Sequence, residues 1–246
     1  MLLQLATWPE VEAYLATSRS VILPIGSTEQ HGPNGMIGTD SLTADAIAKG
    51  VGEATGALVA PPINVGMAQH HMAFAGSMTL RPTTLIAVVR DCVVSLARHG
   101  FERFFFINGH GGNIATVTAA FSEIYAEASL GPTGNRASLK CALRNWWENA
   151  GVRSLSKELF GNAEGGHATP SEVSVTWFLH PAQAKPMTLD PPIAPYGNFA
   201  DAADYRRSFP DGRIGSNPGL ASVDAGKRIF NAAVEALTAD YKSFAA

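Results

Sequence analysis

Short apolar runs alternate along the chain with longer segments in which apolar residues recur at helical spacing. The runs typical of buried strands are Val21–Ile25, Leu58–Ala60, Phe104–Ile107 and Lys140–Asn145. Helical periodicity with recognisable ends covers residues 41–55, 82–100, about 114–129 and 223–244. Because strands that alternate with helices form βαβ units, the pattern predicts an α/β fold, a three-layer α/β/α sandwich with a mostly parallel central sheet.

Length and charge limit the classes of function. A chain of 246 residues suits one domain, and we expect a single domain over 1–246. The formal net charge of −3 gives no reason to expect nucleic acid or an anionic membrane as a partner. No apolar run could span a bilayer, and the N-terminus lacks the basic region of a signal peptide. Cys92 and Cys141 are predicted to be buried free thiols, which indicates the cytoplasm.

The segment Val21–Asp40 carries the strongest chemical signal. Its apolar run passes into a Gly- and Pro-rich loop that holds Glu29, His31 and Asp40. Open α/β sheets place their chemistry in loops at the carboxyl ends of strands. Glu29 and His31 are two residues apart, so in an extended loop both can point the same way. A polar surface loop is the alternative, but three metal-capable side chains after a buried strand favour a metal or catalytic site.

Two further loops contain histidines. In the loop 66–77, His70 and His71 are neighbours, so at most one faces a given site in extended backbone. We expect His71 to face inward and to contact substrate or support a ligand, with a surface pair as the alternative. The loop Asn108–Asn113 follows the clearest strand and would present His110 at its carboxyl end. A phosphate-binding loop is only weakly indicated there, because neither a G-x-G-x-x-G pattern nor a P-loop lysine is present.

Two segments in the second half of the chain complete the candidate site. Trp146 and Trp147 end a strand-like run, where they either pack in the core or wall a pocket for a small planar substrate. His167 and Glu172 are five residues apart, and Pro170 suits the start of a helix. A Glu in the first turn also interacts favourably with the helix dipole, which is the structural alternative for Glu172.

Four segments, in this order, resemble the motifs of the creatininase (creatinine amidohydrolase) family. The first resembles LP-x-G-S-x-E-Q-H-G-P followed by T-D, and departs only where Asn34-Gly35-Met36 replaces His-Leu-Pro, near the substrate in that family. The loop 66–77 resembles the second motif loosely, Asn108–Asn113 matches the third, and Gly166–Ser174 resembles the fourth. In creatininase itself a Glu stands two residues after the motif histidine, where this chain has Gly112.

The resemblance implies a pair of divalent ions, zinc and/or manganese, bridged by a carboxylate. The implied metal ligands are Glu29, His31, Asp40, His110 and Glu172. Asp40 would bridge, with Glu29 and His110 on one ion and His31 and Glu172 on the other. Glu172 would also replace the ligand missing at Gly112 and belong to the catalytic residues. The other implied catalytic residue is His167, as proton carrier. His71, Trp146 and Trp147 are the candidate substrate contacts.

The implied reaction is hydrolysis of a non-peptide C–N bond in a small cyclic amide or formamide, with water activated by the metal ions. Alternatives are creatininase proper and a non-catalytic, metal-stabilised binding or assembly protein. Retention of His167 argues against a non-catalytic protein, which needs no proton carrier. A phosphate-ester hydrolase is disfavoured because the four motifs contain no Arg or Lys. The expected partner is a small molecule, and the resemblance implies a homo-oligomer, a hexamer.

Overall fold

A four-stranded parallel sheet forms the centre of the protein. The computed structural model describes residues 1–130 and 139–246. The strands are β1 (Ser20–Ile25), β2 (Leu58–Val59), β3 (Arg103–Asn108) and β4 (Lys140–Asn145), in the order β2-β1-β3-β4. Every neighbouring pair is parallel, and β1 pairs with β3 from Ser20 opposite Arg103 to Ile25 opposite Asn108. The predicted α/β class is confirmed.

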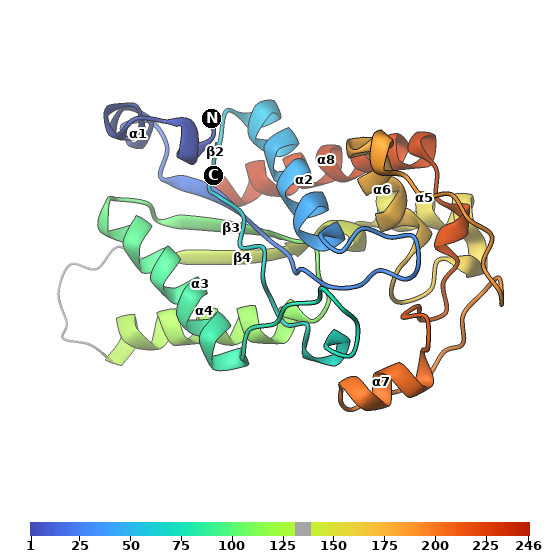
Figure 1. The fold of residues 1–246 in the computed structure, drawn as a ribbon. Coiled ribbons are helices and arrows are strands. Elements are labelled where there is room, and N and C mark those ends of the chain that lie inside the picture. Colours follow the sequence, from blue (N-terminus) through green and yellow to red (C-terminus); the bar gives the residue numbers. More distant parts are fainter. Residues whose placement is uncertain (131–138) are drawn as a thin grey trace.

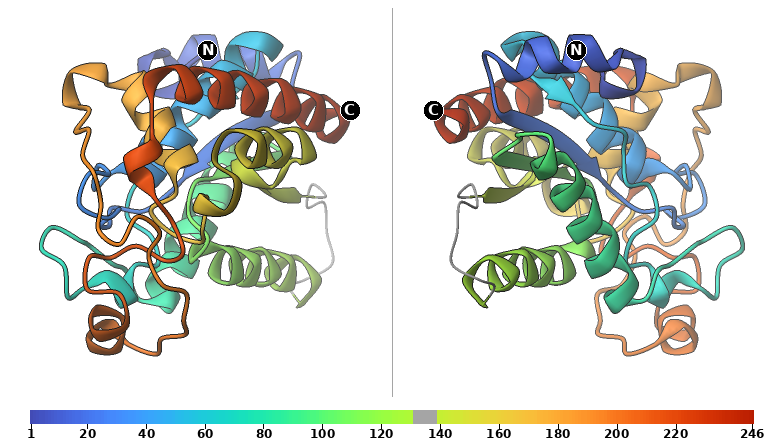
Figure 2. Two further views of the ribbon diagram at one scale, coloured as in Figure 1. Left: turned by 90° about the vertical axis from the view of Figure 1, so that its right-hand side faces the viewer. Right: turned by 90° about the vertical axis from the view of Figure 1, so that its left-hand side faces the viewer.

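Helices cover both faces of this sheet (Figures 1 and 2). One face carries α2 (Thr39–Thr55), α5 (Ala150–Phe160), α6 (Pro170–Leu179) and α8 (Val223–Ala245). The other carries α1 (Trp8–Leu15), α3 (Pro82–Arg98) and α4 (Asn113–Leu130). Successive strand residues point to opposite faces, so Phe104 and Phe106 pack under α3 and α4 while Phe105 packs under α8. The strands are therefore buried on both sides, as three-layer folds require.

Several element boundaries differ from those expected. Helix α2 begins at Thr39 rather than Ser41, which places Asp40 in its first turn. The tryptophan pair follows β4 in a 3₁₀ turn, Trp146–Glu148, instead of ending the strand. Two helices were not predicted: α5 and the short α7 (Ala202–Ser208).

The two cysteines are less buried than predicted. Cys92 and Cys141 are free thiols, as expected, but both are half-buried rather than buried. Each lies at the edge of the core under α3 and α4. Burial raises the pKa of the Cys141 thiol to about 11, so it is protonated at neutral pH. Among the described residues, no helix is both long and apolar enough to cross a membrane.

The segments that follow the strands meet at the carboxyl edge of the sheet. The loop after β1 leads into α2, the loop after β3 leads into α4, and the loop 161–169 joins α5 to α6. This last loop is held from behind by residues 214–217: His167 and Ile214 form an antiparallel bridge, and Asn217 N donates to Ala163 O over 2.8 Å. All the predicted site residues lie on these segments or beside them.

Candidate metal centre and active site

Two glycines allow the start of α2 to contact the ends of β1 and β3. A Cβ atom on Gly26 would lie 2.4 Å from Ser41 N, and one on Gly109 would lie 2.0 Å from Asp40 O. Any larger residue would therefore push the helix away from the strands. The glycines of the first and third motifs thus place Asp40 between the two loops that carry the other candidate ligands.

Five side chains form two overlapping groups of possible metal ligands. Glu29, Asp40 and His110 offer atoms that all lie within 4.8 Å of one another, and so do His31, Asp40 and Glu172. His110 Nδ1 is 3.2 Å from both Glu29 Oε1 and Asp40 Oδ2. His31 Nε2 is 3.0 Å from Asp40 Oδ1 and 3.8 Å from Glu172 Oε2. Asp40 thus offers one oxygen to each group.

Backbone carbonyls orient both histidines of these groups. His110 Nε2–H donates to Met67 O over 2.8 Å, and His31 Nδ1–H donates to Glu29 O over 3.0 Å. Each ring therefore turns its other nitrogen toward the carboxylates. Such a hydrogen bond on the far nitrogen fixes the tautomer and is the usual arrangement of a metal-binding histidine.

The carboxylates of the candidate site have few hydrogen-bond or ion-pair partners in the protein itself. Both oxygens of Glu29 and Oδ2 of Asp40 are buried and accept no hydrogen bond. Within residues 1–130 and 139–246, only histidines lie within ion-pair distance of Glu29, Asp40 and Glu172. Two buried carboxylates and a third, half-buried one are strongly unfavourable so close together without compensating charge. The residues therefore fit divalent ions, and imidazole with carboxylate suits zinc or manganese.

The protonation of the metal-free site supports this view. Burial raises the pKa of Glu29 well above its ordinary value, and the carboxylates of Asp40 and Glu172 add to the rise. Burial lowers the pKa of His31, but Asp40 and Glu172 outweigh it and raise this pKa to about 9. In the metal-free protein, protons take the place of cations among these groups. Binding a cation must therefore release protons.

The position of Glu172 is compatible with both roles that its sequence suggested. Its Oε1 accepts from Thr169 N over 2.6 Å, and Thr169 Oγ1 accepts from Glu172 N over 3.2 Å, which together cap α6. Its Oε2 is the atom that faces His31. One oxygen thus fixes the side chain at the helix start and leaves the other available as a ligand.

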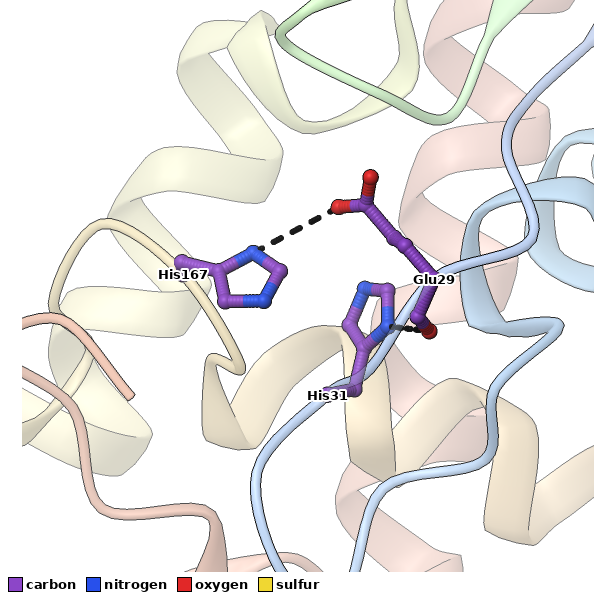
Figure 3. A group of neighbouring side chains, drawn as sticks. All are labelled: Glu29, His31 and His167. Carbon is purple, nitrogen blue, oxygen red and sulfur yellow. Dashed lines mark hydrogen bonds and ion pairs between the residues drawn. The ribbon is translucent and has the colours of Figure 1, made fainter. Parts of the chain in front are cut away.

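His167 lies beside Glu29 and His31, with one ring nitrogen directed toward the Glu29 carboxylate (Figure 3). Its Nε2–H donates to Gln30 O over 2.8 Å, and its Nδ1 lies 3.8 Å from Glu29 Oε1. Burial, with a contribution from His31, holds its pKa well below the ordinary value, so the ring is neutral. Glu29, His31 and His167 form a third group of possible ligands. The position therefore suits either a proton carrier or a ligand.

Of the neighbouring histidines, His71 is buried and His70 is half-buried, so His71 is the one that faces inward. His71 Nε2 lies 3.2 Å from Glu29 Oε1, and His71 Nδ1 lies 2.9 Å from Gln30 Nε2. Of the two roles expected for His71, these contacts match support of a ligand. Gln30 was missed by sequence reasoning; it also donates to Gly212 O over 2.9 Å.

The segment Asn34-Gly35-Met36, where the first motif departs from the family pattern, contacts the loop that carries His31. Asn34 Nδ2 donates to Pro218 O over 3.0 Å, and Gly35 N donates to His31 O over 3.1 Å. A Cβ on Gly35 would lie 2.5 Å from His31 Cβ. The segment therefore supports the loop that carries His31.

A cavity of about 560 Å³ opens over these groups. Its volume suits a small molecule. The described residues that line it include the predicted site residues Asp40, His110, Trp146, Trp147, His167 and Glu172. Glu29, His31 and His71 are not among its described lining residues. Trp146 also packs in the core, where it is 1 % exposed. Sequence reasoning missed Arg153, Lys157 and Glu164, which line the same cavity.

Comparison with known proteins identifies the family of this chain. A family model described as creatinine amidohydrolase matches residues 4–240. The chain belongs to the creatininase family. It is an enzyme of the class that hydrolyses C–N bonds other than peptide bonds.

Individual relatives in this family are named for different activities. The chain is 30 % identical over 241 residues to the mycofactocin precursor peptide peptidase of Mycobacterium ulcerans, covering 92 % of this chain and 81 % of that protein. It is 30 % identical over 185 residues to the creatinine amidohydrolase of Pseudomonas putida, covering 71 % and 70 %. A mutant creatininase complexed with creatine superimposes with a TM-score of 0.82 at 26 % identity, covering 98 % and 97 %. Other similar creatininase structures are described as manganese and zinc–zinc forms.

In this creatininase-family chain, Gly112 is required by the position of His110. A Cβ on Gly112 would lie 2.4 Å from His110 Nε2 and 2.7 Å from Met67 O, the two atoms joined by a hydrogen bond. A side chain at this position would therefore break the contact that orients His110.

Proposed function

We propose that the protein is a binuclear metal-dependent amidohydrolase that cleaves a non-peptide C–N bond in a small cyclic amide or formamide. The observation that carries the proposal is Asp40, a buried carboxylate with one oxygen in each of two ligand groups beneath a cavity of about 560 Å³. Three carboxylates and two imidazoles exceed the needs of one four-coordinate ion and suit a bridged pair.

Glu29, Asp40 and His110 would hold one ion, and His31, Asp40 and Glu172 the other. When bound, the pair would supply Lewis-acid activation of water and of the substrate carbonyl. The chain itself supplies fixed ligand orientation: Met67 O and Glu29 O each accept from a histidine, and Thr169 holds Glu172.

His167 is the proposed proton carrier. Its ring lines the cavity, is kept neutral by burial, and has its Nε2–H fixed on Gln30 O. Nδ1 can therefore accept a proton and deliver it to the leaving nitrogen. A neutral imidazole with one free nitrogen is what this step requires.

Trp146 and Trp147 are the proposed substrate walls. Their rings meet edge to face with centroids 6.0 Å apart, and both border the cavity. Flat, apolar walls suit a small planar amide. Creatininase proper remains the alternative within the family, but it is disfavoured by Gly112. A non-catalytic protein is disfavoured by family membership and by His167.

The basic residues that border the cavity also bear on the alternative of a phosphate-ester hydrolase. Arg153 and Lys157 border it, although neither belongs to the four motifs. Both side chains are exposed, and Arg153 lies 3.9 Å from Glu148 in an ion pair. They lack the buried, convergent arrangement that phosphate recognition uses, so C–N hydrolysis remains the proposal.

Hydrolysis assays test this function. Protein loaded with zinc or manganese should open or deformylate at least one compound in a panel that includes creatinine, hydantoin, succinimide and N-formyl amines. Chelation should abolish turnover and added metal should restore it. Turnover that survives complete metal removal would contradict the proposal.

The proposal extends to the assembly and location of the enzyme. Following the family resemblance, we take the active form to be a homo-oligomer, a hexamer, of single-domain chains. We place it in the cytoplasm, where free thiols such as Cys92 and Cys141 persist.

A further inference from the structure

Glu164 is a half-buried residue of the cavity wall whose carboxyl group the proposed chemistry does not use. Its Oε1 accepts a hydrogen bond from Ser171 Oγ, and Ser171 Oγ lies 3.0 Å from Thr169 Oγ1 in the cap of α6. Its Oε2 is buried and has no hydrogen-bond partner. Side-chain acceptors that are shielded from solvent are nearly always satisfied, so an unpaired one in a cavity wall calls for a ligand.

The backbone on both sides of Glu164 is fixed. Ala163 O accepts from Asn217 N over 2.8 Å, and Gly166 N donates to Ile214 O over 2.8 Å. Between them Gly165 has a φ of +71°, and a Cβ there would lie 2.5 Å from the backbone of residues 214–216. The carboxyl is therefore held in place before any substrate arrives, as a specificity-determining group should be.

The cations near the cavity do not neutralise this carboxyl. In the described part of the chain, no Arg or Lys lies within ion-pair distance of Glu164; the ion pair of Arg153 is with Glu148. Burial raises the pKa of Glu164 to about 7, and the Ser171 hydrogen bond opposes that rise. A hydrogen-bond donor that reached Oε2 would stabilise the ionised form.

We infer that Glu164 Oε2 accepts a hydrogen bond from the substrate, and that the substrate is an amide carrying an N–H donor in addition to its scissile C–N bond. This inference rests on the proposed function for the identity of the site. Such a contact discriminates strongly, because an analogue without the N–H leaves the buried carboxylate oxygen unpaired.

The test measures binding separately from turnover. Zinc-loaded protein is titrated calorimetrically with hydantoin, which has two N–H groups, and with its N,N′-dimethyl derivative, which has none. The variant is Glu164→Gln, which keeps the size of the side chain and can keep the Ser171 contact while turning an N–H toward the cavity. The matched control is Glu158→Gln on the exposed face of α5, where Glu158 pairs with Arg228.

Wild type and Glu158→Gln should prefer hydantoin by about tenfold or more, and Glu164→Gln should lose that preference. Comparing variants removes the effect of methyl bulk. An unchanged preference in Glu164→Gln would overturn the assignment, and so would a wild type that binds both compounds equally or neither. Turnover is assayed on the same samples: a lost preference in Glu164→Gln without any hydrolysis by wild type would support Glu164 and contradict the proposed function.

Discussion

Replacing Asp40 with alanine is expected to remove metal from both halves of the centre. Asp40 is the only residue shared by the group with Glu29 and His110 and the group with His31 and Glu172, among the side chains described. Its loss takes one ligand from each ion and leaves the remaining carboxylates to repel each other. Elemental analysis should show that the variant loses more than one ion per chain.

The matched control is Asp45→Ala, one turn further along α2, where Asp45 pairs with Lys49. It should keep the metal content of wild type. Asp40→Asn, which preserves the size of the side chain, separates loss of the carboxylate from loss of packing. If Asp40→Ala and Asp40→Asn both lose only one ion, or none, the bridging role is wrong.

Replacing His167 with alanine is expected to leave the metal content unchanged and to lower turnover by about 10²–10⁴-fold, the usual contribution of a positioned acid or base. The reason is that its Nε2–H is committed to Gln30 O while Nδ1, 3.8 Å from Glu29 Oε1, carries no proton. Metal content and the rate of hydrolysis are measured on the same preparation. His180→Ala is the control, because His180 is exposed at the far end of α6.

The His167 variant distinguishes the two roles that the geometry permits. His167 lies close enough to Glu29 and His31 to complete a ligand group. A fall of about one ion per chain in His167→Ala would therefore make it a ligand, and the proton carrier would have to be sought elsewhere. Unchanged metal with unchanged turnover would remove it from the mechanism altogether.

The central sheet could be predicted because its strands are encoded locally. Residues 21–25 and 104–107 are continuous apolar runs, which parallel strands buried on both faces require. Helix α8 was predicted for the same kind of reason, since its apolar positions recur at helical spacing over 23 residues. Of the two helices that were missed, α7 has only seven residues, and of these only Tyr205 is buried. So short a helix depends on tertiary packing more than on its own sequence.

For the candidate site, too, the local sequence identified some features and missed those that depend on distant contacts. Glu29, His31 and Asp40 were recognisable because they follow one strand, and His110 because it follows another. The roles of individual residues depended on distant partners. Gln30 contacts His71 only because residues 69–71 fold back over the first loop, a contact across 41 positions.

Glu164 is the clearest example of a residue whose setting depends on distant parts of the chain. Its local sequence, Asn-Ala-Glu-Gly-Gly, is that of an ordinary polar loop. The hydrogen bonds that fix its backbone come from residues 214–217, about fifty positions away. Helix α5, which carries the other missed cavity residues Arg153 and Lys157, packs against α8 rather than against its sequence neighbours alone. Contacts between segments so far apart in the chain cannot be inferred from the local sequence pattern.

The measurement that tests the account most directly is the metal content of the purified wild-type protein by elemental analysis, before and after chelation and after reconstitution with zinc or manganese. A binuclear centre bridged by Asp40 predicts close to two ions per chain, lost on chelation and regained on reconstitution. A protein that holds no metal and takes up none would contradict the account, because the buried carboxylates of Glu29 and Asp40 and the half-buried one of Glu172 would then lie together without the cations that their arrangement requires.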